Sequence, residues 1–114
     1  MNTNYDLDNR TYTFAKNVRA MCREIKGKFL LKPDILQVIR SSGSVAANYI
    51  EGDNALSKKD KIHRFKIVRK EARESLLWLK LIKESESIKE LDCLIIEAEE
   101  LVKIFSSIIN KVSR

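Results

Sequence analysis

Basic side chains recur along one stretch of this chain at a spacing that suits the binding of phosphate groups. Residues 58–73 contain eight Lys and Arg against two acidic residues, a net charge of +6, while the rest of the chain has fourteen of each sign. Seven-residue steps return to the same side of an α-helix. A row of cations on one side attracts polyanions, which release counterions on binding. We define the basic row as Lys59, Lys66, Arg69, Lys70, Arg73 and Lys80.

The basic row has a second interpretation, which the sequence leaves open. Charged residues on a helix often form an ordinary solvated face, or pair with acidic residues of another subunit. No aromatic residue alternates with these cations, so base stacking of the single-strand-binding kind is not predicted. If the row binds a nucleic acid, RNA or DNA, it is expected to contact the backbone and not to read the bases.

Residue types that perform catalysis or hold metals are few and far apart. The single histidine, His63, cannot supply the two Glu-x-x-His pairs of a di-iron bundle. A zinc site would need His63 to converge with Cys22 and Cys93, which lie far from it in the sequence. The two cysteines form no CxxC pattern, and we interpret both as small core residues. The chain is predicted to be no enzyme and to carry no metal or cofactor.

Glu51 is the carboxylate in the most unusual sequence setting. It lies at the end of a segment of apolar and small residues. A buried carboxylate requires a partner, and Arg40, Arg64 or Arg69 could supply one. The sequence therefore predicts that Glu51 forms a structural ion pair and does not act as a catalytic acid.

Long helices with short connections are predicted to position these residues. Only three Gly and one Pro occur, too few for a fold with many turns. The signals Ser57-x-x-Asp60 and Ser87-x-x-Glu90 resemble capping boxes at helix starts. The predicted helices run from about 8 to 28, from 33 to 52, from 57 to about 85, and from 87 toward the C-terminus.

Each predicted helix carries one apolar stripe at three- and four-residue steps. Short loops make consecutive helices antiparallel, so we predict an all-α, up-down-up-down four-helix bundle over 8–114, after a flexible tail at 1–7. No apolar run approaches a membrane span and no signal peptide is evident, so a cytoplasmic location is expected. The stripes are Phe14, Val18, Met21, Cys22 and Ile25; Ile35, Leu36, Ile39, Ala46 and Ile50; Phe65, Val68, Ala72, Leu76 and Leu79, widened by Trp78 and Ile82; and Leu91, Leu94, Ile95, Ala98, Leu101, Val102, Phe105, Ile108, Ile109 and Val112.

Small residues dominate the segment 40–52. They allow another backbone to approach closely, and Gly52 suits a helix C-cap. The segment therefore predicts tight helix packing, which leucine at Gly43 or Ala47 should disrupt.

The same segment, Arg40-Ser41-Ser42-Gly43-Ser44-Val45-Ala46-Ala47-Asn48-Tyr49-Ile50-Glu51-Gly52, resembles the second helix of a family of four-helix-bundle proteins. These are the ribosomal-protein-like proteins of intervening sequences in bacterial 23S ribosomal RNA. The likeness continues through Ser57-Lys58-Lys59-Asp60, Lys66-Ile67, Lys70-Glu71-Ala72-Arg73-Glu74 and Trp78-Leu79, and covers about 14–82. The family-motif positions are Ser44, Asn48, Glu51 and Gly52 on the second helix and Glu71, Arg73 and Glu74 on the third.

This resemblance implies a homo-oligomer, expected to be a pentameric ring, with no known enzymatic activity. The accessory protein of diversity-generating retroelements is similar, which implies nucleic-acid binding and a partner such as a reverse transcriptase. Two functions therefore stay open: a nucleic-acid-binding oligomer that uses the basic row, and a protein-interaction scaffold that binds no nucleic acid.

Overall fold

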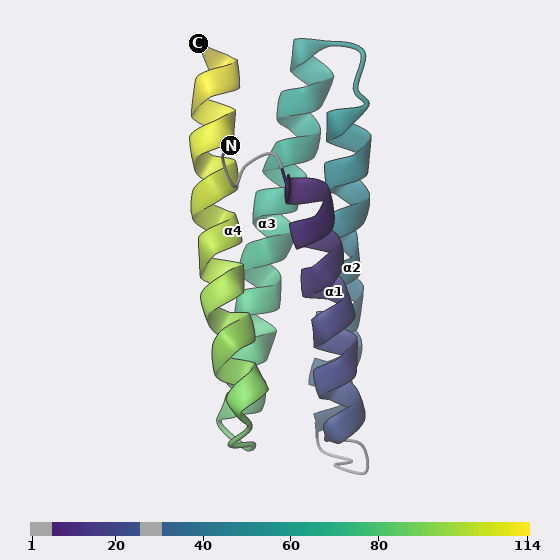
Figure 1. Ribbon diagram of the computed structural model, residues 1–114, viewed down its shortest axis with the longest axis vertical. Coiled ribbons are helices and arrows are strands. Elements are labelled where there is room, and N and C mark those ends of the chain that lie inside the picture. The colour runs from purple at the N-terminus through teal and green to yellow at the C-terminus, as the bar shows by residue number, and fades with distance from the viewer. Residues whose placement is uncertain (1–5, 26–30) are drawn as a thin grey trace.

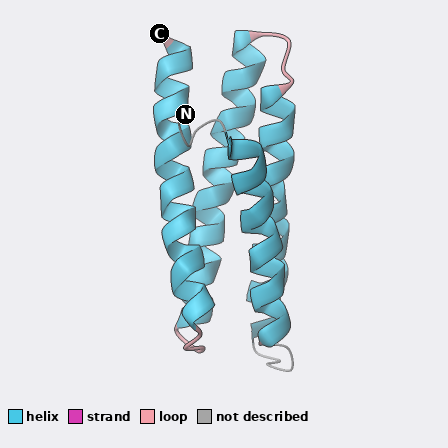
Figure 2. Ribbon diagram, viewed as in Figure 1, coloured by secondary structure: helices cyan, strands magenta, loops and turns pink. Residues whose placement is uncertain are grey.

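Four helices form a bundle in the computed structural model, which describes residues 6–25 and 31–114 (Figure 1). They are α1 (Leu7–Glu24), α2 (Lys32–Asp53), α3 (Lys58–Lys83) and α4 (Lys89–Ser113). Consecutive helices run in opposite directions, and the described residues contain no strand (Figure 2). This confirms the antiparallel all-α bundle. None of the four described helices is long and apolar enough to cross a lipid bilayer.

The helix boundaries follow the sequence signals closely but not everywhere. Leu7 is already helical and buried, whereas the rest of the predicted tail lies outside the described residues except for Asp6. The predicted extension of the first helix to 28 is wrong, because α1 ends at Glu24; residues 26–30 lie outside the described part. Pro33 stands in the first turn of α2, where its missing N–H removes no helix hydrogen bond.

One of the two predicted caps is present. Ser57 has extended backbone geometry, and its Oγ accepts a hydrogen bond of 3.1 Å from the backbone N–H of Asp60. The predicted cap at Ser87 is wrong, because Ile88 is the residue before α4 and makes no side-chain cap hydrogen bond. Ile88 packs partly buried against the core, so hydrophobic contact sets the start of α4.

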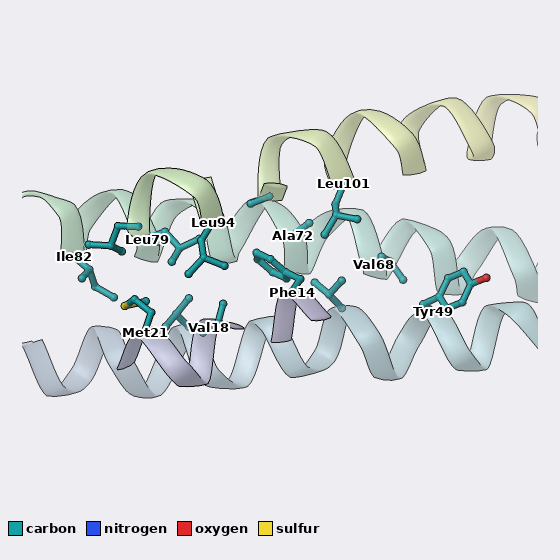
Figure 3. Close-up of a cluster of buried hydrophobic side chains, with 14 of the residues drawn as sticks. Phe14, Val18, Met21, Tyr49, Val68, Ala72, Leu79, Ile82, Leu94 and Leu101 are labelled. Atoms are coloured by element: carbon teal, nitrogen blue, oxygen red, sulfur yellow. The ribbon is translucent and has the colours of Figure 1, made fainter. Parts of the chain in front are cut away.

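The core runs along the bundle between the stripes of α1, α3 and α4, which are largely buried as predicted (Figure 3). At one end three aromatic rings from three helices meet. The ring of Tyr49 stacks on that of Phe65 with centroids 6.0 Å apart and planes 7° from parallel. Phe105 meets both rings edge-on, at 6.0 Å from Tyr49 and 5.5 Å from Phe65. These ring distances and orientations are ones that the aromatic quadrupole favours. The three rings therefore contribute to the packing of α2, α3 and α4 against one another.

The helix α1 is joined to α2 far more extensively than to α4. Between α1 and α4, Arg10 donates from Nε and Nη2 to the two carboxylate oxygens of Glu97, at 3.0 and 2.6 Å. This hydrogen bond raises the pKa of Arg10. A paired, half-buried guanidinium therefore links α1 to α4 where apolar contact is limited.

The predicted apolar stripe of α2 is wrong in part, because Ile35 and Ile39 pack partly buried against the core but two other residues of the stripe face outward. Leu36 and Ile50 are 58% and 51% exposed. The Ser41 and Ser75 hydroxyls, both fully buried, lie 2.7 Å apart across the α2–α3 seam. Small side chains let the two helices approach, and buried hydroxyls are tolerated when they find such partners. The face of α2 that packs inward is Val38, Ser41, Ser42, Val45, Tyr49 and Gly52.

Gly52 is not a C-cap, because α2 continues to Asp53 and Asn54 follows as the cap. A Cβ at Gly52 would lie 2.5 Å from Cε1 of Phe65, so the glycine makes room for that ring. Ala47 is exposed, and its replacement by leucine is no longer expected to disturb packing within the bundle.

Candidate nucleic-acid interface

Five residues of the basic row have exposed side chains on α3, and the sixth, Arg69, is half-buried. The buried residues of the same helix include Phe65, Val68, Ala72 and Leu79. Seven-residue steps keep the row on one side of α3, away from this stripe. The exposed five are Lys59, Lys66, Lys70, Arg73 and Lys80.

Most cations of the row form no ion pair with a carboxylate in the described part of the chain. Across 6–25 and 31–114, no carboxylate forms an ion pair with Lys59, Lys66, Arg73 or Lys80. Lys70 Nζ lies 3.8 Å from a Glu71 oxygen, a weak contact for a side chain that is 62% exposed. These charges are therefore available to an external anion.

Two acidic residues of α3 are occupied by an arginine from α2. Arg40 Nη2 donates to Glu71 at 3.2 Å and to Glu74 at 2.9 Å. The Glu71 side chain is only 8% exposed, so it is a buried carboxylate in the α2–α3 seam. Removing Arg40 would leave it without its main partner, which is costly for a buried charge.

The predicted ion pair of Glu51 is wrong. Glu51 is exposed, and no described residue forms an ion pair with it. Each residue turns a helix by about 100°, so Glu51 points away from the face that carries its neighbour Gly52. Arg40, one of its predicted partners, pairs with Glu71 and Glu74 instead.

Three of the four family-motif positions on α2 lie four residues apart and contact α3 or one another. Asn48 Nδ2 donates to the carbonyl and the hydroxyl of Ser44, both at 2.9 Å. Arg64 Nη1 of α3 donates to Asn48 Oδ1 at 3.0 Å. Gly52 packs against Phe65, so these residues contribute to the contact between α2 and α3. Sequence reasoning missed the Asn48–Arg64 contact, although the four-residue spacing of Ser44, Asn48 and Gly52 signalled a shared face.

The two cysteines have different surroundings, and the prediction that both are core residues is wrong for Cys93. Cys22 is buried, whereas Cys93 is exposed, and both are free thiols. Cys93 lies two positions after the buried Leu91, about 200° around α4, and so misses the stripe. Within the described ranges, no cluster of three His, Cys, Asp or Glu residues could hold a metal ion, and His63 is exposed.

We expect the two thiols to react at very different rates with a disulfide reagent. Burial raises the pKa of Cys22 to about 11, so roughly one in a thousand of these thiols is ionised at pH 8. Titration of the native protein with the disulfide reagent should modify one cysteine quickly. Adding denaturant should expose the second cysteine and allow it to react. Peptide mapping that finds Cys22 modified first would contradict the structure.

Comparisons with known proteins agree with this architecture. The family model for "23S rRNA-intervening sequence protein" matches residues 4–107. A solved structure from Bacteroides thetaiotaomicron, a protein of unknown function from the S23 ribosomal protein family, is similar, with a TM-score of 0.83 and 25% sequence identity. The alignment covers 91% of this chain and 95% of that one. No curated protein matches the chain.

Proposed function

The chain belongs to the 23S rRNA-intervening sequence protein family, and from this premise we propose that it is a non-enzymatic, oligomeric bundle that binds the backbone of RNA or DNA through the basic row of α3. One observation carries the proposal. The whole net charge of +6 arises within residues 58–73, and five cations of the row are exposed on one helix. Such a concentration of charge favours a polyanionic partner.

The proposed mechanism is electrostatic. Phosphates displace counterions as they meet the lysine and arginine head groups, so affinity falls as salt rises. The rigid helix holds the cations at fixed intervals, and ring stacking contributes nothing because the row contains no aromatic side chain. Binding is therefore expected to depend weakly on sequence and strongly on ionic strength.

A gel-shift titration at increasing salt tests this proposal on single-stranded RNA, single-stranded DNA and duplexes. For a single strand, the slope of log affinity against log salt should be about −0.7 for each phosphate contacted. The two substitutions Lys66→Glu and Arg73→Glu together reverse two charges of the row. They should abolish the gel shift, because each replaces attraction to phosphate by repulsion.

The matched control is Lys16→Glu with Lys111→Glu, which changes the net charge by the same amount at exposed positions of α1 and α4. This control should keep most of the affinity. If both pairs weaken binding equally, general charge and not the basic row is responsible. No shift with RNA or DNA at low salt would reject nucleic-acid binding.

The second candidate is an oligomeric protein-interaction scaffold. Exposed leucines on the two most extensively packed helices favour it, since Leu36, Leu77 and Leu81 are 58%, 50% and 42% exposed. Such a surface could join copies into a homopentamer or bind a protein such as a reverse transcriptase. Light scattering tests the assembly, and a mass equal to the 13.2 kDa chain would contradict it.

A cytoplasmic location is also part of the proposal. The free thiols Cys22 and Cys93 suit a reducing compartment, where disulfides rarely persist. Cell fractionation with an antibody to the native protein would test it, and recovery from an oxidising compartment would contradict it.

A further inference from the structure

A hollow of about 310 Å³ lies among the side chains of the basic row. This volume is at the lower limit of the roughly 300–1,000 Å³ typical of small-molecule sites, so it suits one small group. Four cations, one carboxylate and one leucine line it, all of them from α3. The lining consists of Lys66, Arg69, Lys70, Arg73, Glu74 and Leu77.

The charges around this hollow favour an anion. Glu74 is its one carboxylate, and Arg40 holds that carboxylate at 2.9 Å. Arg40 also holds the nearby Glu71 at 3.2 Å, so one guanidinium occupies both acids. The four cations of the lining therefore project from neighbouring positions of α3, with only the weak Lys70–Glu71 contact at 3.8 Å as an ion pair among them in the described part of the chain. Like charges so placed repel until an anion joins them.

One cation of the hollow contacts a second helix. Arg69 is half-buried, and its Nη1 lies 3.4 Å from Ser106 Oγ of α4, within hydrogen-bonding reach. A guanidinium that is already restrained loses less side-chain entropy when a ligand binds. Arg69 can offer its remaining N–H groups to phosphate oxygens, while the lysines act as point charges.

We propose that this hollow anchors a single phosphodiester of a single-stranded nucleic acid, with its nucleoside against Leu77, and that Arg40 is a positioning residue for the site. The inference rests on the proposed function and deepens it. Leu77 is 50% exposed beside the cations, so it offers apolar contact to a sugar or an unpaired base. A duplex keeps its bases stacked inside, so a single strand can use this contact better.

Arg40 acts on the ligand indirectly. It pairs with carboxylates that would otherwise compete with the phosphate for the cations of the hollow. The Glu74 side chain is 42% exposed and, once released, can turn toward the cations of the hollow. Arg40→Gln should therefore weaken binding of a fluorescent oligouridylate by roughly fivefold, the effect of one pair of unit charges about 4 Å apart in water. Glu74→Gln should strengthen binding by a similar factor.

The double variant Arg40→Gln/Glu74→Gln separates positioning from simple loss of charge. If Arg40 acts only through Glu74, the double variant should bind about as tightly as Glu74→Gln alone, whereas independent charge effects would cancel and return the affinity of the unmodified protein. Arg23→Gln removes an exposed cation from α1 and is the matched control, with little expected effect. If the double variant binds only as well as the unmodified protein, as additive effects predict, or if Arg23→Gln weakens binding as much as Arg40→Gln, the role assigned to Arg40 is wrong.

NMR on the unmodified protein provides a readout that does not depend on the fold of a variant. Uridine monophosphate should shift the Leu77 methyl signals and the Arg69 side-chain N–H signals, and inorganic phosphate should shift only the latter. If oligouridylate binds without shifting Leu77, the hollow is not the anchor, although the proposed function stands. If uridine monophosphate shifts Leu77 but no strand binds, the proposed function and the strand-anchoring role both fail.

Discussion

Replacing Phe105 with alanine is expected to lower the free energy of unfolding by about 4 kcal/mol. Phe105 is fully buried, and its ring meets Tyr49 and Phe65 at 6.0 and 5.5 Å. The truncation removes apolar contact, breaks two edge-on aromatic pairs and leaves a cavity between three helices. Since small domains have only about 5–15 kcal/mol of stability, the change is a large fraction of the total.

Urea unfolding followed by circular dichroism measures this loss, with Ile96→Ala as the matched control. Ile96 belongs to the same helix but is 60% exposed, so its truncation should cost below about 0.5 kcal/mol. Phe105→Leu should lie between the two, because leucine fills part of the cavity. A loss below about 1 kcal/mol for Phe105→Ala would show that the aromatic cluster does not join the helices as described.

Helices α3 and α4 could be predicted well because one side of each helix is apolar and the other is mostly polar or charged. The residues between the apolar positions of α4 are mostly charged or polar, so Phe105 was assigned correctly to the core. In α2 both sides carry apolar or small residues, and periodicity alone chose Leu36 and Ile50, which are exposed. The buried side is decided by a partner in another helix, the Ser41–Ser75 hydroxyl contact, which no local pattern encodes.

The candidate site shows the same division between local and tertiary information. Seven-residue spacing was sufficient to predict that Lys59, Lys66 and Arg73 share one side of α3, and all three are exposed. The role of Arg40 could not be predicted, because its contacts with Glu71 and Glu74 depend on the register between α2 and α3. That register is set by packing along the whole seam.

Gly52→Ala is expected to destabilise the bundle by about 2 kcal/mol, although alanine is the better helix former. The added Cβ would lie 2.5 and 2.7 Å from two ring carbons of Phe65 and 3.2 Å from Cβ of Arg64. The ring cannot easily move away, because it is stacked on Tyr49 and met edge-on by Phe105. Thermal unfolding should show a Tm lower by roughly 8 °C.

Gly43→Ala is the matched control in the same helix. Its added Cβ would lie 3.1 Å from Nη2 of Arg19, which donates to the Ile39 carbonyl at 3.2 Å. A small shift of this guanidinium should therefore offset part of the helix-forming gain of up to about 1 kcal/mol and leave the stability little changed. Because the clash at Gly52 depends on one ring, Phe65→Leu should recover part of the loss caused by Gly52→Ala, a coupling that a purely local backbone effect would not produce. Equal stability of the two alanine variants would mean that Phe65 repacks freely, and the requirement for glycine at position 52 would then have to lie outside the bundle's own packing.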